Sequence, residues 1–209
     1  MAKQNKGRKF VAVSATAALV ASAIVPVASA ASFSDQNQIA DWAKDYVEYV
    51  VDNGLMNGNT DGTFAPTATF TRAQAAQVIV NYLGLDTENT EAAFADVKED
   101  AWYYGVVNAV AAEGLVNGVG GGNFAPEAPI TRQDAAKLFG ELLGLDAEAA
   151  DLSSLDQFSD ADKIAEYAAG YVAIFVDAEV INGRDNGTFD PTGCITRQEL
   201  AKIVALAVQ

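Results

Sequence analysis

The chain has 209 residues with 28 Asp and Glu against 13 Lys and Arg, and its formal net charge is −15. This charge argues against nucleic acids and anionic membrane surfaces as partners, because both are bound through basic patches. The chain contains no His and one Cys. A Cys–His nucleophile and a zinc site built from Cys and His are therefore excluded, and the single thiol cannot form an internal disulfide.

Residues 1–30 have the three parts of a secretory signal peptide. Four Lys and Arg residues precede an apolar stretch at 10–25, and Ala-Ser-Ala at 28–30 is a small-residue cleavage site. The apolar stretch contains hydroxyl residues and ends at Pro26, which makes a retained membrane anchor the less favoured alternative. Cleavage after Ala30 removes four of the 13 cations and no carboxylate. The mature chain then keeps nine cations against 28 acidic residues, a formal charge of −19.

A Thr-Arg motif recurs three times with a period of roughly sixty residues. Each copy is typical of a helix start, because Thr is a favoured N-cap and a Gln, Asp or Glu three residues later can bond back to it. Apolar residues at helical spacing follow, and Gly84 and Gly144 lie where a left-handed glycine would end the first two helices. The three copies are Phe70-Thr71-Arg72-Ala73-Gln74, Ile130-Thr131-Arg132-Gln133-Asp134 and Ile195-Thr196-Arg197-Gln198-Glu199.

Arg72, Arg132 and Arg197 fall at the first helical position. A cation there opposes the helix dipole at a cost of a few tenths to about 1 kcal/mol, so three copies in register indicate an anion that offsets it. The anion is either a carboxylate of the protein or a carboxylate or phosphate of a ligand. A ligand would be held by the Arg and by free N–H groups of the helix N-terminus. Both alternatives can hold, in different copies.

Each Thr-Arg motif is preceded by the same series of features. A Phe-x-Asp triplet comes first, an aromatic residue enters a first helix, and an Asn-Gly turn leads through a glycine-containing loop to Phe-x-Pro. Each repeat is therefore expected to be helix, long loop, helix. Three copies should share one core, because two helices bury little alone. The opening carboxylates are Asp35, Asp96 and Asp160, and the entry aromatics are Trp42, Trp102 and Tyr167.

Three smaller expectations follow from local composition. Gly54 and Gly114 should end the first helices of repeats one and two, whereas Glu179 takes this place in repeat three, whose helix should end without a left-handed glycine. The connectors at 86–93 and 146–157 are acidic and small and are expected to be exposed. Cys194, between a Gly and an Ile, is expected to be a small packed thiol.

Together these features resemble the surface layer homology (SLH) domains of bacterial cell-surface proteins, from Phe33 to about Val208. The third copy has the Ile-Thr-Arg-x-Glu motif of that family, while the first two have Gln74 and Asp134 at its acidic position. The resemblance implies an all-α fold, with three helix–loop–helix SLH repeats in a pseudo-threefold spindle around a shared helical core. The expected domains are a signal peptide at 1–30 and SLH repeats at 31–86, 87–146 and 147–209.

The resemblance also implies a function and a site. Family members anchor secreted proteins non-covalently to the wall or S-layer of Gram-positive bacteria. They hold a secondary cell wall polymer, a peptidoglycan-linked glycan that often ends in pyruvylated N-acetylmannosamine, in grooves between neighbouring repeats. The resemblance implies no catalytic residue, cofactor or metal, and no membrane contact after signal removal. The positions that match the family's groove residues are Asp35, Trp42, Gly58, Arg72, Asp96, Trp102, Gly118, Arg132, Asp160 and Arg197.

Each of these positions has a structural alternative. The arginines could form internal ion pairs, and the opening carboxylates could cap a helix or pair with an Arg. Trp42 and Trp102 are expected in the core in preference to a sugar platform, because apolar helix faces usually turn inward. Gly58 and Gly118 would let the backbone approach a sugar. Charge reversal at Arg132 is expected to weaken wall binding without loss of helix, and a loss of folding would indicate a structural Arg.

Three other functions are alternatives to wall anchoring: calcium binding, glycoside hydrolysis and self-assembly. Residues 57–62 are similar to the start of an EF-hand loop, but its twelfth position is Ala68 and the second copy lacks matching ligands. A glycosidase would need a unique carboxylate pair, whereas these carboxylates recur with the repeats. A self-assembling S-layer module without specific glycan binding is the alternative, and its partners would be lattice neighbours. The chain ends within the last helix of repeat three, so we expect an anchoring piece of a longer protein or a small stand-alone wall-binding protein.

Overall fold

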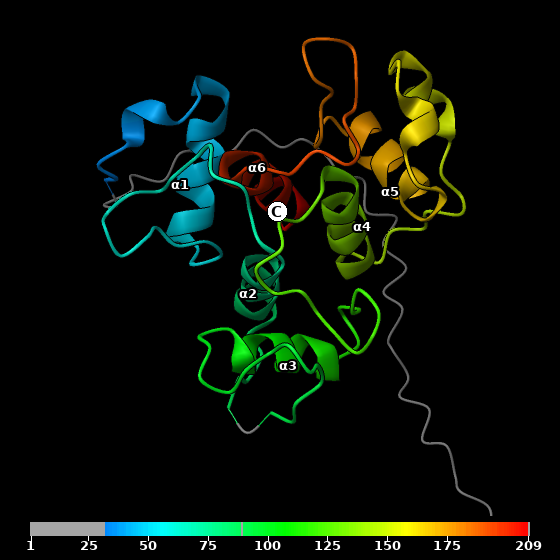
Figure 1. Ribbon diagram of the computed structural model, residues 1–209. Helices are drawn as coiled ribbons and strands as arrows, with labels where there is room; N and C mark the ends of the chain where they lie inside the picture. Colours follow the sequence, from blue (N-terminus) through cyan, green and yellow to red (C-terminus); the bar gives the residue numbers. More distant parts are fainter. Residues whose placement is uncertain (1–31, 89, 209) are drawn as a thin grey trace, which may run out of the picture.

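The computed structural model describes residues 32–88 and 90–208, so the predicted signal peptide at 1–30 lies outside the described residues. Within these two ranges the chain forms α-helices and short 3-10 helices and no β-strand (Figure 1), which confirms the all-α prediction. None of these helices is long and apolar enough to cross a membrane. The α-helices are α1 Lys44–Asp52, α2 Arg72–Leu83, α3 Tyr104–Ala112, α4 Arg132–Leu142, α5 Glu166–Asp177 and α6 Arg197–Ala207. The 3-10 helices are η1 Gln36–Gln38, η2 Asp41–Ala43, η3 Leu152–Gln157 and η4 Ala161–Lys163.

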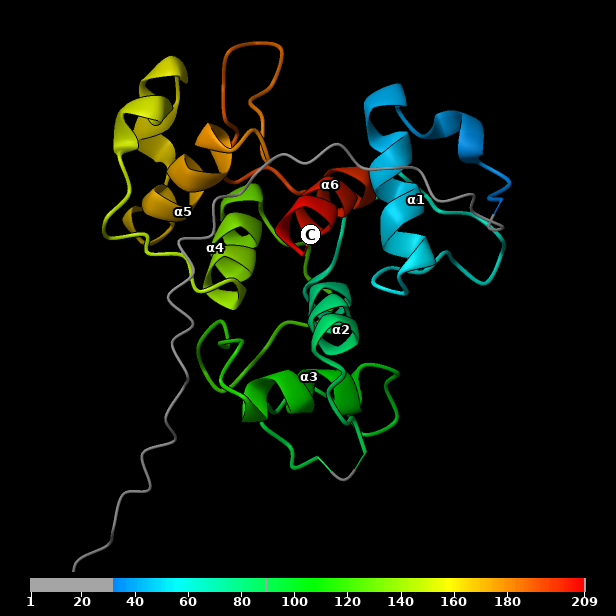
Figure 2. The same cartoon turned by 180° about the vertical axis from the view of Figure 1, so that it is seen from behind.

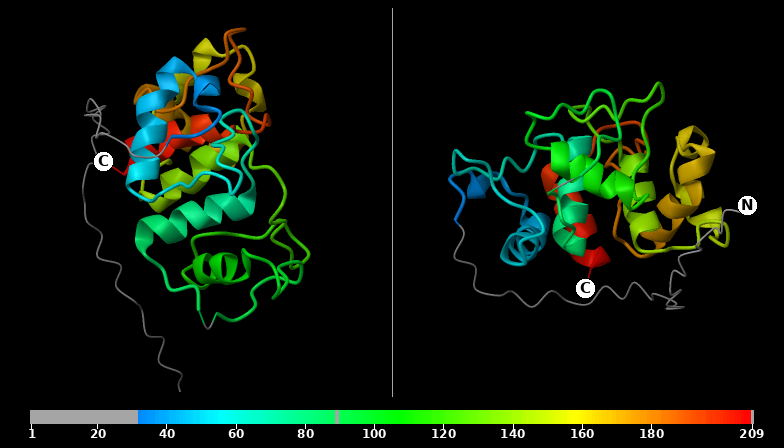
Figure 3. Two further views of the ribbon diagram at one scale, coloured as in Figure 1. Left: turned by 90° about the vertical axis from the view of Figure 1, so that its left-hand side faces the viewer. Right: turned by 90° about the horizontal axis from the view of Figure 1, so that it is seen from below.

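The second helix of each repeat lies at the centre of the molecule. Helices α2, α4 and α6 are surrounded by α1, α3 and α5, as Figure 1 and the opposite view in Figure 2 show. In the left-hand view of Figure 3, the end of α6 lies on the side of the molecule opposite to the long loops. The three repeats therefore form one threefold-like body with a shared helical centre, as the sequence predicts.

The helix pairs are formed between repeats. Helix α3 packs on α2, α5 packs on α4, and α1 packs on α6. Each first helix therefore lies against the second helix of the preceding repeat, and the first repeat is paired with the third. This arrangement closes the three repeats into a ring, unlike an open array in which the terminal repeats each contact one neighbour.

Backbone hydrogen bonds close the same ring at the helix starts. The Phe70 amide donates to Ile195 O at 3.0 Å, the Ile195 amide donates to Ile130 O at 3.1 Å, and the Ile130 amide donates to Phe70 O at 2.9 Å. The three side chains are buried, with Ile195 fully so. The residue before each Thr-Arg motif thus joins the three repeats at one point.

Each long loop is held in place by an aromatic pair whose loop member is buried. The Phe of the Phe-x-Pro segment packs on the Phe of the opening triplet, with ring centres 5.2–5.6 Å apart in the three repeats. The loop phenylalanines Phe64, Phe124 and Phe189 are at most 1% exposed. The loop Phe therefore anchors each long loop to the opening triplet of its own repeat.

The N-caps follow the predicted pattern. Thr71 and Thr196 form complete capping boxes with Gln74 and Glu199. Thr131 accepts from the Asp134 amide, and its hydroxyl donates to the Asp134 carboxylate at 2.7 Å. The shorter Asp side chain does not return a bond to the Thr131 amide in the described structure.

Helix α5 ends without a glycine, as expected, and it still ends in a left-handed residue. Glu179 has φ 57°, the same left-handed conformation as Gly54 at φ 66° and Gly114 at φ 72°. The geometry is therefore preserved in repeat three without a glycine. A side chain with a Cβ in this conformation costs roughly 1 kcal/mol, so the strain at Glu179 is offset by the packing of α5 and by Lys202, which donates to Glu179 O at 2.6 Å.

Replacing Glu179 with Gly is expected to stabilise the fold by about 1 kcal/mol, because glycine adopts the left-handed conformation without Cβ strain. Urea unfolding of both chains measures this change. Glu179→Ala is the control, because it removes the same carboxylate and keeps the strained Cβ. An equal gain in Glu179→Ala would assign the effect to charge and contradict this explanation.

The second connector is more ordered than its composition indicates. It contains η3, which packs on α5 and buries Leu155 at 6% exposure, whereas most of the other residues of 146–157 are exposed, as expected. The connectors also cross the first helices closely. A Cβ at Gly105 would overlap the Thr87 carbonyl, and a Cβ at Gly170 would overlap the Ala147 carbonyl.

The equivalent position in α1 is Asp45, which is exposed. Gly105→Ala and Gly170→Ala are each expected to destabilise the protein by about 2–3 kcal/mol, because the connector backbone must move. Asp45→Ala is the matched control, with little change expected. Thermal or urea unfolding of the three variants tests this, and a glycine variant as stable as the parent chain would refute it.

Candidate functional site

The guanidinium group of each motif arginine binds the long loop of the following repeat. Arg72 donates from Nε to Phe124 O and from Nη2 to Asn117 O, both at 2.8 Å. Its guanidinium carbon also lies 4.5 Å from the centre of the Phe124 ring, a cation–π distance. The equivalent contacts join Arg132 to Phe189 and Asn182, and Arg197 to Phe64 and Asn57.

The sequence indicates a protein carboxylate or a ligand anion beside each Arg, and the loop carbonyls are partners that it does not predict. Each arginine thus binds the long loop of the next repeat, and the third repeat binds the loop of the first. Arg132 is 2% exposed and Arg197 is 6% exposed. These arginines are therefore part of the structure between repeats as well as part of any site built there.

The helix N-termini do not supply free N–H groups. The amides of Arg72 and Ala73 donate to Ala128 O and Pro126 O of the next loop, at 3.0 and 2.9 Å. The next amide, that of Gln74, donates to the capping hydroxyl. The same pattern recurs at α4 and α6. The prediction that these N–H groups would hold a ligand anion is wrong, because backbone carbonyls and caps already accept from them.

The opening carboxylates hold the opposite side of the same loops. Asp35 accepts from the amides of Phe64 and Ala65, one on each oxygen, at 2.8 and 2.7 Å. Ala65 has φ 54°, a strained left-handed conformation that this double hydrogen bond stabilises. Asp96 and Asp160 do the same for Phe124 with Ala125 and for Phe189 with Asp190.

Each Phe of the Phe-x-Pro loops therefore donates its amide to an Asp and accepts an Arg at its carbonyl. The expectation that the opening carboxylates accept hydrogen bonds from sugar hydroxyls stays a prediction, and this geometry does not favour it. Both oxygens of each carboxylate have backbone partners. None of the three Asp residues lines the grooves described below.

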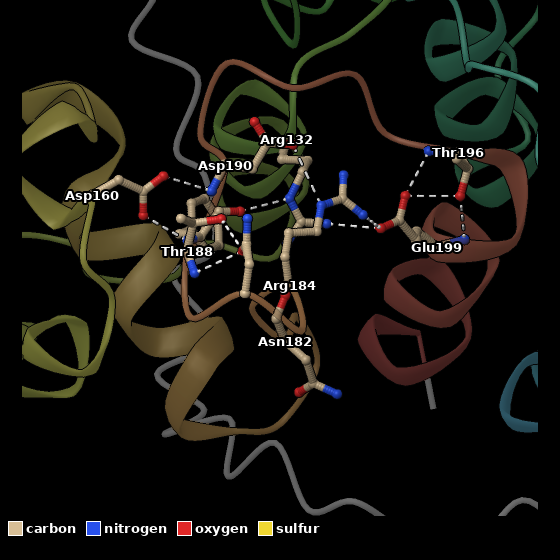
Figure 4. A network of polar contacts seen from close by, with 10 residues as sticks. Arg132, Asp160, Asn182, Arg184, Thr188, Asp190, Thr196 and Glu199 are labelled. Atoms are coloured by element: carbon tan, nitrogen blue, oxygen red, sulfur yellow. Dashed lines mark hydrogen bonds and ion pairs between the residues drawn. The ribbon is translucent and has the colours of Figure 1, made fainter.

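One of the three arginines also has a carboxylate partner. Arg132 Nη1 lies 2.9 Å from Glu199 Oε1, and Arg184 Nη1 binds the same oxygen. Figure 4 shows Glu199 between these two guanidinium groups and the capping Thr196. Burial lowers the pKa of Arg132 and the charge of Arg184 lowers it further, while Glu199 opposes both effects. An internal ion pair is thus present in one copy.

Three grooves lie between the repeats, and each one contains a motif arginine. We name them after Arg72, Arg132 and Arg197, with volumes of about 340, 370 and 210 Å³. Every groove combines the Arg of one repeat, the Asn-Gly turn and second helix of the next, and the entry aromatic of the third. The site therefore exists only when three repeats are assembled.

The entry aromatics are exposed and line these grooves. Trp42, Trp102 and Tyr167 are 50%, 58% and 52% exposed, and they lie in the grooves of Arg132, Arg197 and Arg72 respectively. The expectation that both Trp side chains lie in the core is wrong. Their short entry turns precede or begin the first helices, and the inward face of those helices is filled by residues such as Val47 and Val107.

The glycines of the Asn-Gly turns line the grooves, and packing inside the protein explains why they are glycines. A Cβ on Gly58 would overlap the Phe33 ring, a Cβ on Gly183 would overlap Phe158, and one on Gly118 would meet Phe94 and the Asn123 carbonyl. Glycine is therefore required by the packing of the opening Phe. That requirement is sufficient without a close approach of sugar to backbone.

Several groove residues were not predicted from sequence. They lie two, five and nine residues after the Arg of their own helix, a spacing that places them on neighbouring turns of α2, α4 and α6. Helical spacing from the motif Arg could have identified them. They are Gln74, Gln77 and Asn81 in the first repeat, Asp134, Lys137 and Glu141 in the second, and Glu199 and Lys202 in the third.

The calcium-loop alternative finds no support in the geometry. Asp61 accepts from the amide and the hydroxyl of Thr63, at 2.9 and 2.6 Å, and so closes its own turn. Among the described residues no group of three His, Cys, Asp or Glu side chains could hold a metal ion. Cys194 is partly buried and reduced, next to its backbone bridge with Thr131.

Trp42 and Trp102 thus lie in arginine-containing grooves, at positions that the resemblance implies, and Tyr167 occupies the third groove without having been predicted there. The family model described as the S-layer homology domain matches residues 32–76, 93–136 and 157–201. The chain therefore belongs to the S-layer homology domain family, with three copies.

Similar curated proteins come from several bacteria. The chain is 44% identical over its whole length to the Surface-layer 125 kDa protein of Lysinibacillus sphaericus and 33% identical over 99% to an S-layer protein of Bacillus licheniformis. It is also 32% identical over 80% to exoglucanase XynX of Acetivibrio thermocellus. It spans only 18%, 23% and 16% of these relatives, so the matched part is a small share of each.

Proposed function

We propose that this chain anchors a surface protein non-covalently to the bacterial cell wall by binding a secondary cell wall polymer in its inter-repeat grooves. The observation that carries the proposal is the repeated groove, in which an Arg, an exposed aromatic and an Asn-Gly turn meet from three repeats. Membership of the S-layer homology family and similarity to surface-layer proteins support it.

The chemistry of the grooves suits an anionic sugar. An exposed aromatic ring offers an apolar face to a pyranose ring, and the Asn, Gln and Lys side chains offer hydrogen bonds to hydroxyls. The chain as a whole is strongly acidic, so an anionic ligand has to be attracted by local cations. We therefore propose a glycan carrying a carboxylate, such as pyruvylated N-acetylmannosamine, on the wall of a Gram-positive bacterium.

We propose a binding module and no enzyme. The three recurrent carboxylates bind loop amides, and Asp134 and Glu199 are engaged by Thr131, Tyr167, Arg132 and Arg184. A hydrolytic pair would need two carboxylates free to face one glycosidic bond. The relative named as an exoglucanase shares with this chain only a segment that covers 16% of that protein.

The aromatic platforms provide the test. Trp42→Ala together with Trp102→Ala is expected to weaken binding to isolated native walls at least tenfold, which corresponds to about 1.4 kcal/mol. Both side chains are at least half exposed, so the melting temperature should change little. Tyr82→Ala with Leu152→Ala is the control, because these side chains are exposed outside the grooves. Equal wall binding by the two double variants would contradict the proposed site.

A further inference from the structure

The three grooves share one architecture and differ in whether a carboxylate of the protein lies in the lining. One lining residue of each groove lies two positions after the motif Arg of its own helix, which is a different Arg from the one that names the groove. This residue is Gln74 in the Arg197 groove, Asp134 in the Arg72 groove and Glu199 in the Arg132 groove. These side chains come from the repeat that supplies the Asn-Gly turn. Two grooves therefore contain a carboxylate of the protein near their arginine, and the third contains an amide.

In the Arg132 groove the carboxylate is bound directly by the cations. Glu199 Oε1 accepts from Arg132 Nη1 and Arg184 Nη1, and Glu199 Oε2 accepts from the Thr196 amide and hydroxyl at 2.8 and 2.7 Å. The third cation of the lining, Lys202, donates to the Glu179 carbonyl, and Asp185 adds a second carboxylate to the groove. A ligand carboxylate would have to compete with Glu199 for both guanidinium groups.

In the Arg72 groove the carboxylate is bound by the aromatic. The Tyr167 hydroxyl donates to Asp134 Oδ1 at 2.7 Å, and Thr131 donates to the other oxygen. Burial and this carboxylate raise the pKa of Tyr167 to about 12. The groove also contains Lys137 and Glu141, so its two cations are balanced by two carboxylates. An added anion would meet no net positive charge there.

The Arg197 groove differs from both. Its lining in the described chain contains no Asp or Glu, and Arg197 is its one charged side chain. Gln74 uses Oε1 to accept from the Thr71 amide, which leaves its Nε2 donor without a protein partner among the described residues. Arg197 Nη1 likewise has no partner there. Gln77, Asn81 and the exposed Trp102 complete the lining.

Building on the proposed function, we propose that the Arg197 groove is the primary site for an anionic sugar and that Gln74 determines this preference. In the other two grooves the carboxylates of Asp134 and Glu199 already balance positive charge. In the Arg197 groove the carboxylate of the ligand would do this. The chain then binds one anionic sugar tightly, although it has three grooves of similar architecture.

The test introduces a carboxylate into the Arg197 groove, whose lining has none among the described residues. Gln74→Glu places in the Arg197 groove the residue found in the Arg132 groove, and Glu is compatible with the capping box, as Glu199 shows with Thr196. Gln38→Glu makes the same charge change on an exposed residue of η1 outside the grooves. The probe is the methyl glycoside of pyruvylated N-acetylmannosamine, with the same glycoside lacking pyruvate as the uncharged comparison.

Calorimetric titration of residues 31–209 should give one tight site per chain for the charged probe and at least tenfold weaker binding for the uncharged one. Gln74→Glu should weaken the charged probe at least tenfold, and Gln38→Glu should leave it unchanged. Three equal sites, or no effect of Gln74→Glu, would overturn the assignment while leaving wall anchoring intact. No binding of the charged probe by any variant would overturn both this inference and the proposed glycan.

Discussion

Replacing Arg132 with Ala is expected to destabilise the protein by about 3–5 kcal/mol, a large part of the stability of a typical domain. The guanidinium is 2% exposed and donates to Phe189 O, Asn182 O and Glu199. Its removal leaves the buried Phe189 carbonyl and the part-buried Asn182 carbonyl without this donor, and it leaves Arg184 as the one cationic partner of Glu199 among the described residues. Equilibrium urea unfolding followed by circular dichroism measures the change.

Arg184→Ala is the matched control, because Arg184 binds the same Glu199 oxygen from a side chain that is 34% exposed. Its loss should change the unfolding free energy by about 1 kcal/mol or less, as for other exposed ion pairs. Charge reversal at Arg132 was expected from sequence to reduce wall binding with the helices intact. The burial of Arg132 replaces that expectation with loss of folding. A soluble, fully helical Arg132→Ala chain of unchanged stability would contradict a structural role for the bonds from Arg132 to the long loop of repeat three.

Deleting repeat three is expected to abolish the cooperative fold of the remaining two repeats. Residues 32–146 retain only the α2–α3 pair, since α1 loses α6 and α4 loses α5. The ring of backbone bonds also loses Ile195, and Arg132 loses its loop carbonyls. The fragment should therefore show a broad thermal transition and weak near-ultraviolet circular dichroism.

An open array of repeats makes the opposite prediction, because each of its repeats depends only on its neighbours. In that case the two-repeat fragment would keep a sharp transition within about 10 °C of the intact chain. Such a result would show that the closure between α1 and α6 adds little. Addition of residues 147–209 as a separate chain should restore the transition if the ring is the cooperative unit.

The sequence predicts the elements of this fold well, because its strongest signals are local. A Thr before Arg with Gln or Glu three residues later defines a capped helix start, and α2, α4 and α6 begin as expected. Left-handed Gly84 ends α2 as predicted. The period of the motif predicts three equivalent units, since each signal recurs at the same place in every copy.

The partners of these elements could not be read from the sequence. A helix pattern shows which face is apolar, and it does not show whether the covering helix comes from the same repeat or from another. Arg72 and Asp35 illustrate this, since each binds backbone atoms of a long loop. Every residue has a backbone carbonyl and nearly every residue has an amide, so the sequence does not mark such partners. The short turn before α1 turns Trp42 outward, and apolar character alone favours the opposite.

Co-sedimentation with purified walls tests whether the grooves bind a polymer of the cell wall. The chain from residue 31 onward should sediment with native walls and remain in solution with walls chemically stripped of their secondary polymer. Added free polymer should release it from native walls. Equal retention on native and stripped walls, or none on either, would contradict polymer binding and leave the three arginines with a purely structural role.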